Sequence, residues 1–189
     1  MACFFGFGSL VNASTHRYEM VAPAQVNGWA RAWIDHDLYQ HALLSVIPET
    51  DTRIHGLMAR VPDNNWAELD KRELGYQRYV LNHEEWSAGT ILQPLDDSDI
   101  QMYKHTDGSF ATPDKPILWS YLETVLHGYY QVFGSTGVEA FISTTRHWTV
   151  VSDDRDAPLY PRYRPAVGDA AKAVVLPVMY SLLKRHSVT

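Results

Sequence analysis

The chain has 189 residues, of which 46% are hydrophobic and 20% are charged, and its formal net charge at pH 7 is −6. This length suits a single domain over residues 1–189, and the composition excludes a disordered or fibrous protein. No Lys/Arg-rich run is present, which argues against a nucleic-acid partner, and no apolar run reaches the roughly 18 residues of a membrane-spanning helix. Cys3 is the only cysteine, so no intramolecular disulfide can form. The N-terminus lacks a basic leader, and we therefore expect a cytoplasmic protein.

The N-terminal third is rich in β-forming and aromatic residues. Residues 3–7 are short, aromatic and apolar, which is typical of a buried strand that ends in a glycine turn. Small and large side chains alternate over residues 26–34, as in a strand with two different faces. Residues 41–47 and 53–61 are two further β-rich runs, and the polar residues 48–51 between them predict a hairpin connection.

A short helix is expected in the middle of the chain. It begins after Pro62, where Asp63 is a candidate N-cap, and runs towards Gly75. Residues 79–82 and 89–92 then predict two shorter strands.

Two longer helices are expected in the C-terminal half. The first covers residues 115–133, with Asp114 as a candidate N-cap and Gly134 at the position that ends a helix. The second covers residues 169–183, where Pro177 is expected to kink or stop it. Strands mixed with helices in this order predict an α+β domain, built as a mixed β-barrel or curled sheet with flanking helices.

Glu73 is out of place in the expected short helix. It lies seven residues after Trp66 and four after Leu69, so helical geometry puts its carboxylate on the same inward face. Burial raises the pKa of a carboxyl group, which suits a general acid/base near neutral pH. The alternative is a solvated Glu73 at a fraying helix end, paired with Arg72 or Arg78, and periodicity does not decide between the two.

Residues 6–10, Gly-Phe-Gly-Ser-Leu, follow the first predicted strand. Glycines let the backbone approach a ligand closely, and the N–H groups of such a turn can bind an anion. The segment lacks the third glycine of a dinucleotide fingerprint and the Gly-Lys-Ser/Thr of a P-loop. Taken alone, it also fits a plain tight turn.

Together, these two segments resemble a known family. Phe5-Gly6-Phe7-Gly8-Ser9-Leu10 resembles the N-terminal Tyr/Phe-Gly-Ser-Leu/Asn loop of gamma-glutamylcyclotransferase-like proteins. Leu69-Asp70-Lys71-Arg72-Glu73-Leu74-Gly75-Tyr76 resembles the Leu-Asp-x-Arg-Glu-x-Gly-Tyr segment of the same group, which includes the glutathione-degrading ChaC branch. Gly28-Trp29-Ala30-Arg31-Ala32-Trp33 and His55-Gly56-Leu57 also look like family elements in the expected order. The resemblance covers the first half of the chain and leaves the role of the second half, including Asp153 to Arg155, open.

The resemblance implies a gamma-glutamylcyclotransferase-like mixed β-barrel and a cofactor-free enzyme. In its reaction the α-amino group of a γ-glutamyl substrate attacks the γ-carbonyl, which releases 5-oxoproline and an amine or amino acid. Glu73 matches the family's catalytic glutamate. The expected substrate-binding residues are Phe5, Gly6, Phe7, Gly8, Ser9, Leu10, Tyr76 and Tyr79, with no metal and no cofactor. Glutathione, γ-glutamyl amino acids and γ-glutamyl amines all stay open as substrates, and so does the oligomeric state.

Other readings compete with this one. A non-catalytic binding or interaction protein could keep the same fold, and a cyclising lyase could act on a larger acceptor. Asp35-His36-Asp37 with His41 is the densest group of metal-ligand types, and Asp153, Asp154 and Asp156 form another, although polar turns explain both better. Cys3 lies in an apolar strand, where a free cysteine is usually inert core.

Overall fold

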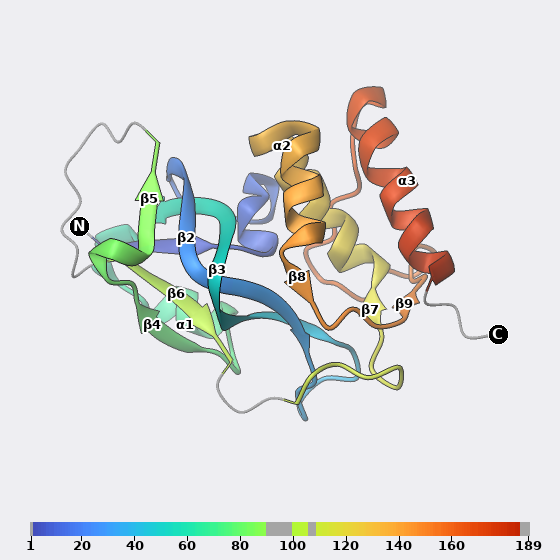
Figure 1. Cartoon of the computed structure of the whole chain (residues 1–189), viewed down its shortest axis with the longest axis horizontal. Coiled ribbons are helices and arrows are strands. Elements are labelled where there is room, and N and C mark those ends of the chain that lie inside the picture. Colours follow the sequence, from blue (N-terminus) through green and yellow to red (C-terminus); the bar gives the residue numbers. More distant parts are fainter. Residues whose placement is uncertain (1, 90–99, 106–108, 186–189) are drawn as a thin grey trace.

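The computed structural model describes residues 2–89, 100–105 and 109–185 and shows a mixed sheet flanked by helices (Figure 1). Seven strands form the sheet in the order β4-β6-β1-β3-β2-β5, with β8 added beside β2. Two short parallel strands, β7 (Ile117–Leu118) and β9 (Val151–Ser152), form a second sheet. The seven strands are β1 (Cys3–Gly6), β2 (Met20–Ile34), β3 (Leu43–Arg60), β4 (Gln77–Val80), β5 (Trp86–Ala88), β6 (Ile100–Lys104) and β8 (Thr145–Arg146).

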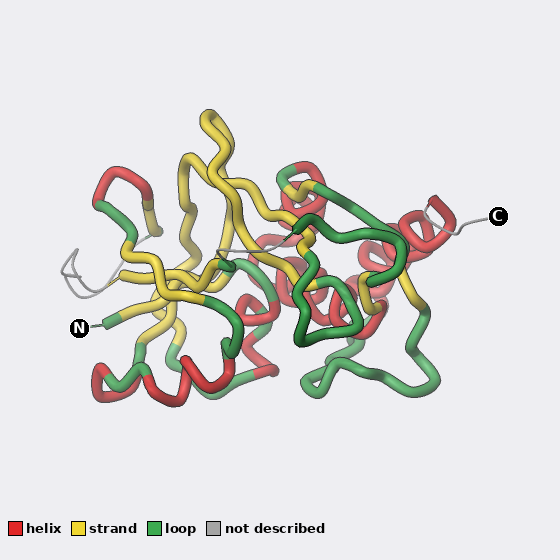
Figure 2. The backbone as a smooth tube through the Cα atoms, turned by 90° about the horizontal axis from the view of Figure 1, so that it is seen from below, coloured by secondary structure: helices red, strands yellow, loops and turns green. Residues whose placement is uncertain are grey.

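The helices are of two kinds. Three are α-helices, α1 (Ala67–Arg72), α2 (Trp119–Ser143) and α3 (Asp169–Arg185), and four are single 3-10 turns, η1 (Ser9–Val11), η2 (Ala13–Thr15), η3 (Pro62–Asn64) and η4 (His83–Glu85). Strands gather at one end of the molecule and α2 and α3 lie side by side at the other (Figure 2). The predicted α+β class is confirmed. A closed barrel is not found in the part of the chain that the structure describes, because β4 pairs only with β6 and β5 only with β2.

β2 and β3 form the longest pair of the sheet. They are antiparallel from Met20 opposite Ala59 to Ile34 opposite Leu43, so the hairpin predicted at residues 48–51 is wrong. The long β2 strand pairs with Pro48 on one side and with Arg53 on the other, so residues 49–52 between them form a bulge opposite Gly28 instead of a turn that joins two strands.

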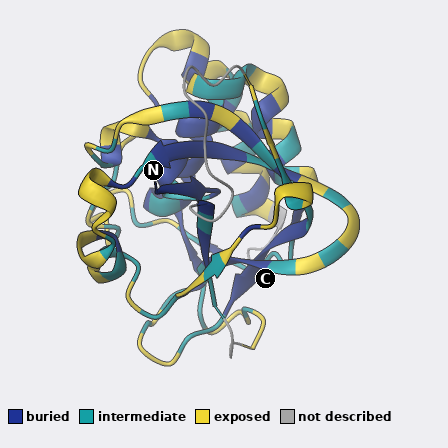
Figure 3. Ribbon diagram, turned by 90° about the vertical axis from the view of Figure 1, so that its left-hand side faces the viewer, coloured by how far each residue is buried: buried dark blue, intermediate teal, exposed yellow. Residues whose placement is uncertain are grey.

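The sheet is covered on both faces, with β1 buried throughout and β2 buried over most of its length, whereas the middle of β3 is exposed (Figure 3). One face packs its larger core against α2 and α3, and Phe5 of β1 belongs to this cluster. The other face packs a smaller cluster under α1, to which Phe4 and Leu69 belong. The residues that follow β1 therefore emerge between the two helical layers.

The predicted helices are present with different boundaries. Asp63 is not an N-cap, because its φ of 52° places it in the left-handed region and the helix begins four residues later, at Ala67. Asp114 does not cap α2 either, since the helix begins at Trp119 after a strand. Gly134 has a φ of 68° and interrupts the helix as expected, but the chain resumes helical geometry up to Ser143.

The C-terminal helix and two short strands also differ from the elements predicted for them. α3 runs through Pro177 without stopping there. β4 begins two residues before the strand predicted at 79–82. The strand predicted at 89–92 lies mostly outside the described residues, and the structure has β5 just before it, at Trp86–Ala88. In the described part of the chain, none of the helices has the length and apolarity to cross a membrane.

Candidate active site

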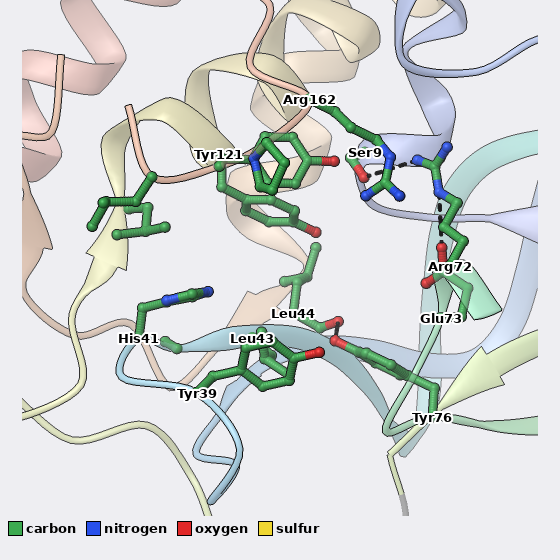
Figure 4. Close-up of a pocket in the computed structure, with 15 residues that line it drawn as sticks. Ser9, Tyr39, His41, Leu43, Leu44, Arg72, Glu73, Tyr76, Tyr121 and Arg162 are labelled. Atoms are coloured by element: carbon green, nitrogen blue, oxygen red, sulfur yellow. Dashed lines mark hydrogen bonds and ion pairs between the residues drawn. The ribbon is translucent and has the colours of Figure 1, made fainter. Parts of the chain in front are cut away.

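A cavity of about 300 Å³ opens beside the first turn after β1. Its walls come from five places in the chain: the start of η1, the segment that leads into β3, the end of α1, the start of α2 and the segment that follows β9 (Figure 4). The lining residues are Ser9, Tyr39, His41, Ala42, Leu43, Leu44, Arg72, Glu73, Tyr76, Leu118, Tyr121, Leu159, Tyr160, Pro161 and Arg162. The cavity thus combines three charged groups with several tyrosines.

The glycine loop forms a smaller hollow of about 40 Å³ next to this cavity. All six predicted loop residues, Phe5 to Leu10, line it together with Glu73 and Tyr76. A side chain at Gly8 would place its Cβ 2.7 Å from the Tyr121 hydroxyl, so only glycine lets the backbone come this close to α2. The structure therefore brings the two segments that carry the family resemblance into one site.

Buried polar groups hold the base of the loop. The fully buried Arg31 donates from Nε to the Phe7 carbonyl at 3.1 Å, and the Tyr129 hydroxyl donates to the same oxygen at 2.8 Å. On the other side of the loop, the Asn12 amide donates to the Thr124 carbonyl of α2 at 2.9 Å. The loop is thus attached to β2 and α2, which makes its backbone groups part of a rigid wall.

Glu73 follows the last residue of α1. Its N–H still donates to the Leu69 carbonyl at 2.9 Å, while its φ and ψ of −97° and 36° end the helix. The carboxylate pairs with Nε of Arg72 at 3.1 Å, yet the Glu73 side chain is only 19% exposed. Both expectations for this residue hold in part, because Glu73 lies at a helix end and pairs with Arg72, but it faces a cavity and is mostly buried.

Burial is the main influence on the protonation of Glu73. It raises the pKa of this carboxyl above its ordinary value, and the nearby Arg72 guanidinium and, to a smaller extent, Arg162 offset part of the rise. Arg72 is itself held in place, with Nη1 donating to the Thr15 carbonyl at 3.1 Å. A carboxyl group with a raised pKa is better suited to accept and return a proton than an ordinary glutamate.

The two predicted tyrosines lie in different places. Tyr76 lines both hollows, but its hydroxyl donates to the Leu44 carbonyl at 2.9 Å and does not contact the Glu73 carboxylate. Tyr79 lines neither hollow, and its hydroxyl donates to the Glu85 carboxylate at 3.2 Å. The structure therefore does not bring Tyr79 to the site.

Tyr121 is a site residue that the sequence does not single out within the helix expected over residues 115–133. It points from α2 against Gly8, and its oxygen accepts a hydrogen bond from the Ser9 backbone N–H. Burial raises the pKa of Tyr121 far above its ordinary value, so its hydroxyl keeps its proton. Helical spacing predicts that this side chain is buried, but no sequence signal marks the glycine loop as its partner.

Arg162 is a second residue that the sequence did not reveal. It lies on the irregular segment after β9, where nothing in the local pattern marks one arginine among several, and reaches the cavity from the C-terminal half. In Figure 4 its guanidinium points towards Ser9 and Arg72.

The competing constellations have structural partners. Asp35 pairs with Lys115, Asp153 pairs with Arg155, and the Asp154 carboxylate accepts from the N–H of Ser120 at the start of α2. No group of three or more potential metal ligands occurs within the described ranges. Cys3 is buried in β1, as expected of a core residue.

Several solved structures are similar to this chain. A structure described as Gamma-glutamyl cyclotransferase aligns at 11% identity with a TM-score of 0.58, over 93% of this chain and 98% of that one. An uncharacterized protein from Homo sapiens aligns over the same shares, at 12% identity and a TM-score of 0.58. YkqA from Bacillus subtilis aligns at 13% identity with a TM-score of 0.57, over 77% of this chain and 55% of YkqA.

These likenesses concern the fold. The chain has the fold of the gamma-glutamyl cyclotransferase structure over nearly its whole length, which the resemblance of the glycine loop and the Glu73 segment predicted. No model of a known protein family matches the sequence, and no curated protein sequence does. At these identities the fold says little of the activity, so any function must be argued from the residues of the site.

Proposed function

We propose that this chain is a gamma-glutamylcyclotransferase that converts a γ-glutamyl compound into 5-oxoproline and a free amine or amino acid. The observation that carries the proposal is the mostly buried Glu73 carboxylate, with its raised pKa, facing the glycine loop across one cavity. The shared fold supports the same reaction class without establishing it.

The reaction needs a positioned acid/base more than a protein nucleophile. The α-amino nitrogen of the substrate attacks its own γ-carbonyl carbon, and a five-membered ring closes as this C–N bond forms. Glu73 takes the proton that the attacking nitrogen loses and gives it to the leaving nitrogen as the original amide C–N bond breaks. A well-placed group of this kind contributes about 10²–10⁴-fold in rate, and holding the chain in its folded shape contributes further.

The oxyanion that forms on the γ-carbonyl oxygen needs hydrogen-bond donors. In our proposal, the backbone N–H groups of Gly8 and Leu10 and the protonated Tyr121 hydroxyl supply them. Both line the small hollow that Glu73 also faces, and neither has to lose a proton to act. Rigid donors of this type stabilise a developing negative charge without reorganisation.

The proposal is tested by incubating the purified protein with glutathione, several γ-glutamyl amino acids and a γ-glutamyl amine. 5-Oxoproline and the released amine are quantified together. We expect both products in equal amounts from at least one compound, and the preferred compound names the leaving group. Saturable binding of these compounds without 5-oxoproline from any of them would refute the enzyme and favour a binding protein of the same fold.

A further inference from the structure

The cavity holds three charged side chains, and two of them already satisfy each other. Arg72 pairs with Glu73, and its remaining donors reach the Thr15 carbonyl and hydroxyl at 3.1 and 3.3 Å and the Ser9 hydroxyl at 3.5 Å. Its planar group is therefore occupied by protein atoms that fix Glu73 and the loop. Arg72 has little capacity left for a ligand.

Arg162 differs from Arg72 in this respect. It makes no hydrogen bond or ion pair with any residue in the described ranges 2–89, 100–105 and 109–185, although it is partly buried and lines the cavity. A guanidinium has five donors and cannot lose its charge in a protein, so an unpaired one in a cavity favours an anionic ligand. It is directed towards the cation Arg72 (Figure 4), and a carboxylate placed there would relieve the repulsion between the two.

The segment that carries Arg162 is fixed to α2 on both sides. The Tyr163 hydroxyl donates to the buried Glu123 carboxylate at 2.7 Å, and the Ala166 N–H donates to the other oxygen of Glu123 at 3.0 Å. The Tyr160 N–H donates to the Ser120 hydroxyl at 3.2 Å. Arg162 therefore projects from a backbone that is held in place, as a binding residue requires.

We propose that Arg162 binds the α-carboxylate of the glutamyl group, an inference that rests on the proposed function. In a γ-glutamyl compound the α-carboxylate and the α-amino group share one carbon atom. If Glu73 takes its proton from that amine, the carboxylate must lie within a few ångströms of Glu73. Arg162 is the charged group of this cavity that has no partner among the described residues, and it is close enough to act electrostatically on Glu73.

This assignment defines a substrate class. The enzyme takes free γ-glutamyl compounds, whose α-carboxylate is ionised. It rejects N-terminal glutaminyl peptides, in which the same cyclisation is chemically possible but the α-carboxyl group is part of a peptide bond. Leaving this partly buried guanidinium without its anion costs a hydrogen bond to a charged group.

The test measures kcat/KM for 5-oxoproline formation with γ-L-glutamyl-ethylamide and with its α-carboxamide analogue. Wild type, Arg162→Gln and Arg162→Lys are compared at the pH plateau of each, with Arg164→Gln as the matched control. Arg164 lies two residues away, is exposed and does not line the cavity. We expect wild type and Arg164→Gln to prefer the free carboxylate by roughly 10- to 100-fold, through a lower KM. Arg162→Gln should reduce this preference to near unity, and Arg162→Lys should restore part of it.

A third substrate, γ-L-glutamyl-L-alanine, differs from the ethylamide by one carboxylate on the leaving group. Arg162→Gln should lower kcat/KM for both compounds by the same factor. A loss confined to the alanine compound would place Arg162 on the leaving group and overturn the inference, and so would an unchanged preference for the free α-carboxylate. If wild type turns over none of these compounds and does not turn over glutathione, the proposed function fails and the inference falls with it.

Discussion

Gly8→Ala is expected to destabilise the protein through a single contact. A Cβ at Gly8 would lie 2.7 Å from the Tyr121 hydroxyl oxygen, 3.4 Å from the Leu44 Cδ2 and 3.9 Å from the Tyr121 Cζ. The Tyr121 ring cannot withdraw easily, because it packs edge-on against Trp33 and Tyr160 with centroid separations of 5.9 and 5.0 Å. Overpacking of this kind costs about 1–3 kcal/mol in free energy of unfolding.

Tyr121→Phe removes the oxygen that clashes and leaves the nearest ring carbon at an ordinary van der Waals distance. Alone, this change costs about 1 kcal/mol, because the Ser9 N–H loses its acceptor. In the double variant, Gly8→Ala should therefore cost less than it does in wild type, with a coupling of at least about 1 kcal/mol.

Guanidinium denaturation of wild type, both single variants and the double variant measures this coupling. Gly89→Ala is the control, since its Cβ would come no closer than 3.8 Å to another group, and it should show no coupling to Tyr121→Phe. Costs of Gly8→Ala and Tyr121→Phe that add within about 0.5 kcal/mol would refute the proposed contact between the loop and α2.

Four further predictions concern charged groups. Arg31→Met should lower the free energy of unfolding by about 1–3 kcal/mol and raise KM, because it removes a buried donor from the Phe7 carbonyl; denaturation and steady-state kinetics measure both effects. Asp154→Asn should cost about 1 kcal/mol in thermal unfolding, since one of the two carboxylate oxygens that accept from Ser120 becomes a donor. Because burial raises the pKa of Glu73, kcat/KM should fall as the pH drops through a value above the ordinary range of a glutamate, and a profile that stays flat down to that range would contradict the assignment. The folded state binds this proton more tightly than the unfolded one, so wild type should lose stability relative to Glu73→Gln as the pH rises from the ordinary pKa of glutamate through the raised one, which denaturation across pH can follow.

The parts of the fold that could be predicted depend on local pattern. The buried β1 strand and the glycine turn after it follow from an aromatic run and two glycines, and α2 and α3 lie where helices were expected over residues 115–133 and 169–183. The hairpin expected at 48–51 failed, because these turn-type residues lie opposite a strand that continues past them, and pairing over that length overrides local turn chemistry. Boundaries such as that of α1 depend on tertiary contacts, and Asp63 adopts a left-handed conformation instead of a cap.

The candidate site also contains residues that the sequence predicts and residues that only the fold brings together. Glu73 and the loop are contiguous segments, so a resemblance in sequence reaches them. Tyr121 and Arg162 enter the site from far along the chain, and only the packing of α2 and its hydrogen bonds to the segment after β9 place them there. Tyr79 was predicted to bind substrate but does not line the cavity, and its hydroxyl donates to Glu85 instead. Proximity in sequence to Tyr76 therefore does not bring this strand residue to the site.

The central claim is that Glu73 is the acid/base of a γ-glutamyl cyclisation. The most direct measurement is the rate of 5-oxoproline formation by wild type, Glu73→Gln and Glu68→Gln on the preferred substrate. Glu68 lies on the same helix with a side chain that is 75% exposed, so it controls for the loss of a carboxylate. We predict that Glu73→Gln loses at least about 100-fold in kcat while remaining folded, and that Glu68→Gln keeps wild-type activity. Equal rates for wild type and Glu73→Gln would contradict the claim.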